Sequence, residues 1–222
     1  MRFRHVVLGA PPKGLDALGD FYEGLGFEVE PDRLLFAAGE TTMEFDPARG
    51  SPFYHFAFLV PGDRFDAAFA WAGSRTELLP DPGTGEAVFE FDFWDAQACY
   101  FEDPAGNIVE LIAHRGMDGN GREDDFAATE IAGLSELGLV GDRRALAAGL
   151  GRLGFELWSG GLEEPDALAF VGERGRTLIL TRAGRGWLPT GRPAEIHPVE
   201  AVFDEGSAML HDGTLVINET SS

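Results

Sequence analysis

The predicted secondary-structure elements follow one order that recurs along the chain, and this repetition restricts the possible folds. A strand, a helix and three short strands are predicted over residues 3–45, and the same order is predicted over residues 54–113. A third copy is predicted over residues 134–181, and three strands after residue 190 form a fragment of a fourth. The sequence therefore predicts an α+β fold of tandem βαβββ modules, with three full copies and a truncated fourth.

The ends of the first and third predicted helices support this repetition. The first helix, over residues 14–23, has apolar residues at helical spacing, and glycines that tolerate a left-handed backbone follow it. Its exit reads Gly-Leu-Gly-Phe-Glu at 24–28, and the third helix is followed by Arg-Leu-Gly-Phe-Glu at 152–156. The two segments are thus expected to fold alike.

A polar, glycine-rich stretch divides the repeats into two groups. Residues 116–132 have the composition of a linker. We therefore expect paired modules one and two in residues 1–115, and a degenerate third module with a partial fourth in residues 133–222.

Charge and cysteine content exclude several classes of function. The chain has 38 acidic and 17 basic residues and a formal net charge of -21, which repels nucleic acids and anionic membrane surfaces. Cys99 is the only cysteine, so no disulfide can form within the chain. Because no leader sequence or membrane-spanning stretch is recognised, we expect a cytoplasmic protein that binds neither nucleic acid nor membranes.

One carboxylate lies in an otherwise apolar strand. The turn Asp103-Pro104-Ala105-Gly106 precedes a predicted strand in which Ile108, Glu110 and Ile112 share a face. A charge between two isoleucines is costly unless something compensates it. Glu110 is therefore either a metal ligand, a partner of an arginine, or exposed on a wet face.

Four residues occupy equivalent positions in the first two modules. His5 and His55 begin the first strands, whereas Glu44 and Glu110 lie in the last strands. Two imidazoles and two carboxylates suit a divalent ion such as Zn, Ni, Co, Mn or Fe, and a six-coordinate ion would keep two positions for water or substrate. Taken singly, the same residues also fit an exposed strand end (His5), a buried core histidine (His55) and a solvated face (Glu44).

The third module lacks a comparable pair of ligands. Its first strand offers Ser135 or Glu136, but its last strand has Ile179 near the place of the carboxylate. We therefore expect the C-terminal half to be a scaffold, or a cavity without a metal.

These residues resemble the vicinal oxygen chelate superfamily, which includes glyoxalase I, bleomycin-resistance proteins and extradiol dioxygenases. The resemblance covers residues 1–114 well and residues 133–181 more loosely. It implies that the βαβββ modules form curved mixed sheets around a cavity. It also implies that His5, Glu44, His55 and Glu110 are the metal ligands. The residues that carry it are His5 in Arg-His-Val-Val-Leu, Phe21–Phe27, His55 in Tyr-His-Phe-Ala-Phe-Leu-Val, and the run Tyr-Phe-Glu-Asp-Pro-Ala-Gly-Asn-Ile-Val-Glu from Tyr100 to Glu110.

The resemblance implies chemistry on a small molecule that carries vicinal oxygens. A bound metal would stabilise an oxyanion or enediolate, and Glu44 or Glu110 would act as the base. The number of ligands is closest to the glyoxalase-like enzymes of the lyase or isomerase type. The cavity could be completed within one chain or across the two-fold axis of a homodimer.

Two alternatives remain open at this stage. One is a metal-free protein that binds small molecules, like the bleomycin-resistance proteins. The other is an iron-dependent extradiol dioxygenase. In the first case aromatic side chains would line the cavity, and the candidates are Trp71, Trp94, Tyr100, Trp158 and Trp187.

Overall fold

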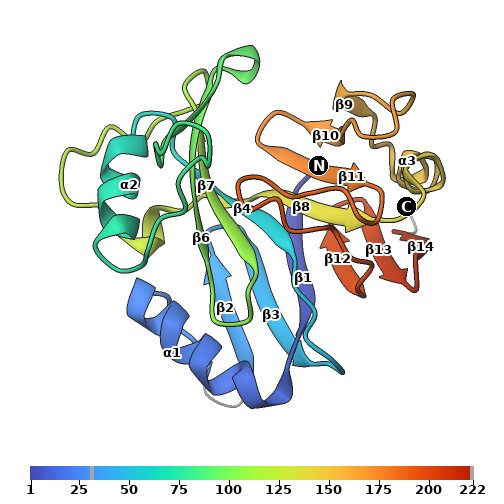
Figure 1. The fold of residues 1–222 in the computed structure, drawn as a ribbon, viewed down its shortest axis with the longest axis horizontal. Coiled ribbons are helices and arrows are strands. Elements are labelled where there is room, and N and C mark those ends of the chain that lie inside the picture. The colour runs from blue at the N-terminus through green and yellow to red at the C-terminus, as the bar shows by residue number, and fades with distance from the viewer. Residues whose placement is uncertain (31–32, 221–222) are drawn as a thin grey trace.

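A computed structural model of the chain, which describes residues 1–30 and 33–220, contains two curved mixed sheets and three α-helices within this range (Figure 1). The predicted α+β fold is confirmed. The six-stranded sheet has, in spatial order, β14 (Thr214–Glu219), β13 (Gly206–His211), β12 (Val199–Phe203), β1 (Phe3–Ala10), β3 (Thr41–Pro47) and β2 (Leu34–Ala38).

The second sheet is larger and carries the central part of the chain. Its eight strands, in spatial order, are β5 (Phe89–Phe91), β6 (Ala96–Glu102), β7 (Ile108–His114), β4 (His55–Val60), β8 (Gly133–Val140), β11 (Arg176–Thr181), β10 (Ala169–Glu173) and β9 (Leu157–Gly160). The helices are α1 (Leu15–Leu25), α2 (Phe65–Gly73) and α3 (Arg143–Leu150), with short 3-10 turns at Pro12–Gly14, Asp92–Trp94, Ala128–Glu130 and Gly151–Leu153.

The pairing of the segments differs from the sequence-based expectation. Modules one and two were expected to pair, but β1 of the first segment pairs antiparallel with β12 of the last. Strand β4 of the second segment pairs antiparallel with β8 of the third. The burial of these strands explains the arrangement, because every residue of β4 and β8 is buried. Strands buried on both faces belong at the centre of a sheet, and each of these two has a neighbour on either side.

Several elements are shorter than the repeat predicts. The strand expected at 27–30 makes only an isolated bridge, between Val29 and Phe36. Up to residue 220 the last segment has no helix, and β12, β13 and β14 form an antiparallel meander. The first segment therefore lacks one strand of the predicted order, and the last segment lacks the helix within the described residues.

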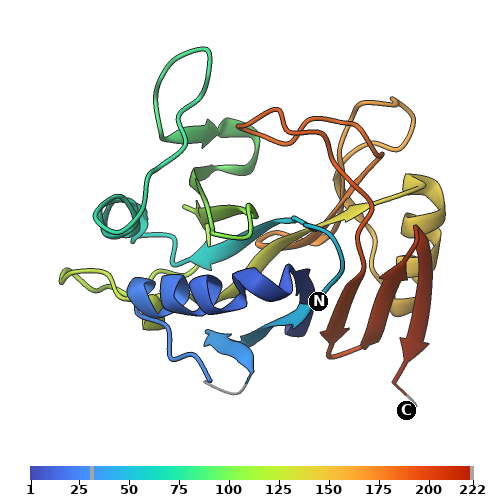
Figure 2. The same ribbon diagram turned by 60° about the horizontal axis from the view of Figure 1, so that its bottom comes forward.

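The main hydrophobic core lies between the two sheets and the helices (Figure 2). Helix α1 buries Leu18, Tyr22 and Leu25, and it ends at Gly26 with a left-handed φ of 97°. The Tyr22 ring stacks on Phe36 at a centroid distance of 4.5 Å. A second, smaller cluster covers the opposite face of the eight-stranded sheet, and this is the face that carries the candidate site.

The predicted linker packs against the protein. Arg64, just before α2, donates a hydrogen bond from Nε to Glu130 at 2.9 Å, and both side chains are buried. Asn120 donates a further hydrogen bond to the same carboxylate at 2.8 Å. Among the residues that the structure describes, no helix is long and apolar enough to cross a membrane.

The turn after β6 has the predicted structure and anchors two site strands. The Asp103 carboxylate accepts hydrogen bonds from the backbone N–H groups of Ala105 and Asn107, and Gly106 has a φ of 81°. Asn107 accepts a hydrogen bond from the Tyr54 N–H at 2.8 Å. This contact joins the beginnings of β4 and β7, so it fixes the strands that carry His55 and Glu110.

Candidate metal site

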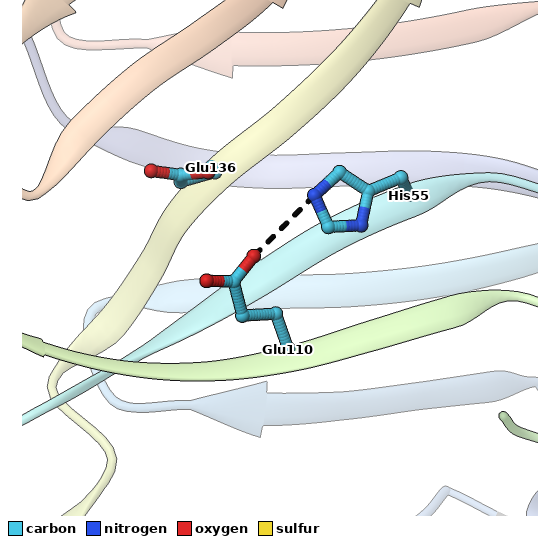
Figure 3. A group of neighbouring side chains, drawn as sticks. All are labelled: His55, Glu110 and Glu136. Atoms are coloured by element: carbon cyan, nitrogen blue, oxygen red, sulfur yellow. Dashed lines mark ion pairs between the residues drawn. The ribbon is translucent and has the colours of Figure 1, made fainter. Parts of the chain in front are cut away.

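Three ligand-type side chains converge on one face of the eight-stranded sheet. They are His55 on β4, Glu110 on β7 and Glu136 on β8 (Figure 3). Ala57 is the register partner of both glutamates, so the carboxylates flank β4 from its two sides. One potential ligand atom of each residue lies within 4.8 Å of the others.

The hydrogen bond of His55 orients its ring. Its Nδ1 lies 3.1 Å from the carbonyl oxygen of Ile108, which can only accept, so Nδ1 carries the proton. Nε2 then presents its lone pair on the other side, where Oε2 of Glu110 lies 3.4 Å away. Fixing one ring nitrogen in this way prepares the other for a metal.

The two glutamates bring uncompensated negative charge into the protein interior. Glu110 is 2% exposed and Glu136 is 4% exposed. No arginine or lysine of the described residues pairs with either carboxylate. Burial, and then the charge of Glu110, raise the pKa of Glu136 well above its usual value. The pair therefore needs either a proton or a bound cation.

The donor set fits a divalent cation. An imidazole and two carboxylates match the preferences of the borderline ions, including Zn, Mn and Fe.

The register between β8 and β11 explains why β11 supplies no fourth protein ligand. Ala57 is paired with Glu110, and the corresponding pair in the third segment is Gly138 with Ile179. The alignment of the predicted modules had already placed Ile179 near the position that a carboxylate occupies in the first two modules.

An aromatic cavity of about 70 Å³ surrounds the three side chains. Three of the five predicted aromatic candidates line it, namely Trp94, Tyr100 and Trp187, whereas Trp71 packs on Phe126. Burial raises the pKa of the Tyr100 hydroxyl well above its usual value, with further contributions from the charges of Glu110 and Glu136. The remaining lining residues are Phe91, Leu168, Phe170, Ile179, Arg185 and Leu188.

The loop between β11 and β12 covers the cavity. Trp187 is 3% exposed, and its ring lies 5.0 Å from that of His55 between centroids. Arg192 fastens the loop, because its guanidinium lies 3.4 Å from the Phe53 ring centroid and donates to the carbonyl oxygen of Gly106 at 2.9 Å. Trp187 was one of the predicted cavity residues, but the loop that carries it was not predicted to cover the site, since no motif marks its course.

The four predicted ligands do not all converge. His5 and Glu44 lie together on the six-stranded sheet, with 2.8 Å between His5 Nε2 and Glu44 Oε2. They are separated from His55 and Glu110 because β1 pairs with β12 and not with β4. The structure instead adds Glu136 from the third segment, which was expected to be a scaffold or a cavity without a metal. The signal for it was present, since Glu136, like Glu110, interrupts an apolar strand.

Comparisons with known proteins support the fold. No protein-family model and no curated protein sequence matches the chain. A solved structure described as a "putative dioxygenase" from Bacillus subtilis has a TM-score of 0.58 and 16% identity, over 100% of this chain and 86% of that chain. This likeness confirms the expected α+β fold of curved mixed sheets.

Two further structures are less similar. Glyoxalase I from Zea mays has a TM-score of 0.48 and 18% identity, over 82% of this chain and 66% of that chain. Oxidase ChaP-H2 has a TM-score of 0.40 and 24% identity, over 55% of this chain and 98% of that chain.

Proposed function

We propose that the protein is a metal-dependent enzyme of the glyoxalase-like lyase or isomerase type, acting on a small molecule with vicinal oxygens. One observation carries the proposal. Two buried carboxylates and an oriented imidazole converge without a cationic partner among the described residues. A divalent ion balances these charges and suits these donors.

The three residues have different roles in this proposal. A metal held by His55, Glu110 and Glu136 would supply positive charge that stabilises an oxyanion on the substrate. Glu136 is the better candidate for the base, because none of the described residues donates a hydrogen bond to its carboxylate. Glu110 is more constrained, since the Tyr100 hydroxyl interacts with it. Proton transfer by a positioned carboxylate typically contributes about 10²–10⁴-fold to a rate.

The walls of the cavity favour an apolar substrate body. Phe91, Trp94 and Phe170 are among the lining residues, and Trp187 lies beside His55. A cavity of about 70 Å³ holds only the reacting end of a molecule. The substrate is thus expected to place an oxygen pair beside the glutamates and an adjoining apolar part against the aromatic rings.

Metal analysis of protein purified without chelators tests whether the protein binds a metal at this site. We expect about one equivalent of a transition metal in the parent, its loss in His55→Ala, and its retention in His5→Ala, the matched change on the other sheet. Metal-free parent protein that also fails to bind added Mn²⁺, Co²⁺ or Zn²⁺ would contradict the proposal.

The reaction class is tested with the metal-loaded protein. Small 2-hydroxycarbonyl compounds with aromatic substituents are incubated in D₂O, and exchange of the carbon-bound proton is followed by NMR. We expect exchange in the parent and a loss of about 10²-fold or more in Glu136→Gln at saturating metal. Oxygen consumption with catechols, without proton exchange, would instead indicate a dioxygenase.

A further inference from the structure

The aromatic cavity has a cationic residue to which the proposed reaction gives no role. Arg185, in the loop between β11 and β12, is the only arginine or lysine among the described residues that line the cavity. Arg185 is half-buried, whereas Glu110 and Glu136 are buried. Leu188, which also lines the cavity, is 39% exposed. The cavity therefore has an acidic floor, and Arg185 lies at its mouth.

The hydrogen bonds of Arg185 hold its guanidinium in place without neutralising it. Nε donates to the carbonyl oxygen of Asp166 at 3.4 Å, and Nη1 donates to that of Gly186 at 2.8 Å. The Asp166 carboxylate pairs with Arg182 instead. Of the five N–H donors of a guanidinium, two thus have partners among the described residues, and neither partner is a carboxylate.

Other arginines of the C-terminal half have a clear structural role. Arg144 pairs with Glu163 on the surface at 2.6 Å. Arg143 is buried and donates to four backbone carbonyl oxygens. Arg185 has neither arrangement. Burial lowers its pKa, so its surroundings disfavour the positive charge, and an anion beside it would offset this cost.

The guanidinium and the carboxylates lie at different places on the cavity wall. The charge of Asp166 acts on Arg185, whereas the charge of Glu110 acts on Glu136. Arg185 contacts the loop before β10, and β11 lies between β10 and β8, the strand of Glu136. Neighbouring strands are about 4.8 Å apart, so β8 and β10 are separated by roughly 10 Å. A molecule with a single ring between two polar ends can reach both places.

We propose that Arg185 binds a carboxylate of the substrate at the mouth of the cavity. This inference rests on the proposed function, which places the oxygen pair of the substrate beside the glutamates. It narrows the substrate class to hydroxyketone acids, with vicinal oxygens at one end, a carboxylate at the other and an apolar segment between them. Guanidinium and carboxylate form charge-assisted hydrogen bonds, which are roughly twice as strong as neutral ones. The net charge of -21 does not prevent this, because exposed charges more than about 8 Å away are largely screened at physiological ionic strength.

Two probes that differ in charge test this carboxylate site. They are the para-carboxy and para-carboxamide derivatives of 2-hydroxyacetophenone, titrated into Mn²⁺-loaded protein. Tryptophan fluorescence reports binding, since Trp94 and Trp187 line the cavity. We expect the parent to bind the carboxylate about 10-fold more tightly than the carboxamide.

Two variants of Arg185 show whether its guanidinium is responsible. Arg185→Gln should weaken binding of the carboxylate about 10-fold and leave binding of the carboxamide unchanged. Arg185→Lys keeps the charge but loses the planar pair of donors, so its affinity for the carboxylate should be intermediate. Arg144→Gln is the matched control, because it removes an equal charge from the surface and should change neither affinity.

The same titrations without Mn²⁺ separate this inference from the proposed function. The metal would bind at the other end of the cavity, so the preference for the carboxylate should persist without it. A chain that binds no metal but keeps this preference would contradict the proposed function and support the Arg185 site. Equal affinities of the parent for the two probes, binding of neither, or an equal loss of both in Arg185→Gln would overturn the Arg185 site.

Discussion

The two sheets carry the same three ligand-type residues in the same register, yet they differ in what surrounds them. On the eight-stranded sheet the histidine and both glutamates are buried and lack a cationic neighbour among the described residues. On the six-stranded sheet His5 is 33% exposed, Glu200 is exposed and Arg33 pairs with Glu44. The comparison shows that strand register places potential ligands, whereas neighbouring charge and burial decide whether they need a cation.

The two faces also differ in how far they are covered: the site on the eight-stranded sheet is covered by a loop, whereas the six-stranded sheet has an open groove. The β11–β12 loop lays Trp187 over the site on the eight-stranded sheet. The corresponding face of the six-stranded sheet has an open groove of about 510 Å³, where Val7, Met209 and Val216 are among the lining residues. Exclusion of water strengthens electrostatic interactions. A charge in the covered site therefore interacts more strongly with its neighbours than a charge on the open face.

Removing the cover should have the largest effect on stability. Trp187→Ala deletes a buried indole, and truncation of such a side chain typically costs roughly 3–5 kcal/mol of unfolding free energy. Met209→Ala on the open face should change it by less than about 0.5 kcal/mol. Urea unfolding measures both. Similar losses in the two variants would mean that the two faces are not covered differently.

A buried acid beside the eight-stranded sheet should make stability depend on pH. Burial raises the pKa of Asp103 to about 6, although Tyr22, Ala105 and Asn107 donate hydrogen bonds to it. The folded protein therefore keeps this proton at pH values where the unfolded chain has released it. As the pH rises from about 4 to about 6, the unfolding free energy falls, and above that range the contribution is constant.

The size of the change in unfolding free energy follows from the shift in the pKa of Asp103. About two pKa units correspond to about 3 kcal/mol lost between pH 4 and pH 7. Asp103→Asn removes the titrating group, so the difference between parent and variant across this range isolates it. A difference that does not vary with pH would show that Asp103 ionises normally. In the β12–β13 turn of the six-stranded sheet the opposite holds, because a hydrogen bond from Arg4 lowers the pKa of Asp204.

Local structure could be predicted from the sequence, because local chemistry determines it. The glycines after α1, the turn at Asp103 and the charge of Glu110 in an apolar strand each indicated the structure that was found. Sheet pairing could not be predicted, since β1 and β12 are almost 200 residues apart and both possible neighbours of β1 are apolar strands.

The unpredicted pairing accounts for the difference between the predicted set of ligands and the cluster that the structure brings together. Once β4 pairs with β8, Glu136 joins His55, and once β1 pairs with β12, His5 and Glu44 are separated from them. Trp187 illustrates a second limit. The sequence suggested it as one of several cavity residues, but its contact with His55 spans more than 130 residues and depends on the course of a loop.

The difference between the two sheets is tested most directly by the same Glu→Gln substitution at the equivalent register position on each sheet. Glu136→Gln keeps the shape of the side chain but removes its charge, so we expect Mn²⁺ or Co²⁺ affinity to fall by about 100-fold, or about 2.7 kcal/mol. Glu200→Gln should leave the affinity unchanged, because Arg33 already compensates Glu44 on that sheet. In metal-free protein we expect the two variants to differ in thermal stability as well. Glu136→Gln should raise the melting temperature, since folding then no longer buries an acid whose pKa is raised by burial and by the charge of Glu110, while Glu200→Gln should not. A variant pair with equal metal affinities and equal melting temperatures would mean that the two sheets are electrostatically equivalent after all.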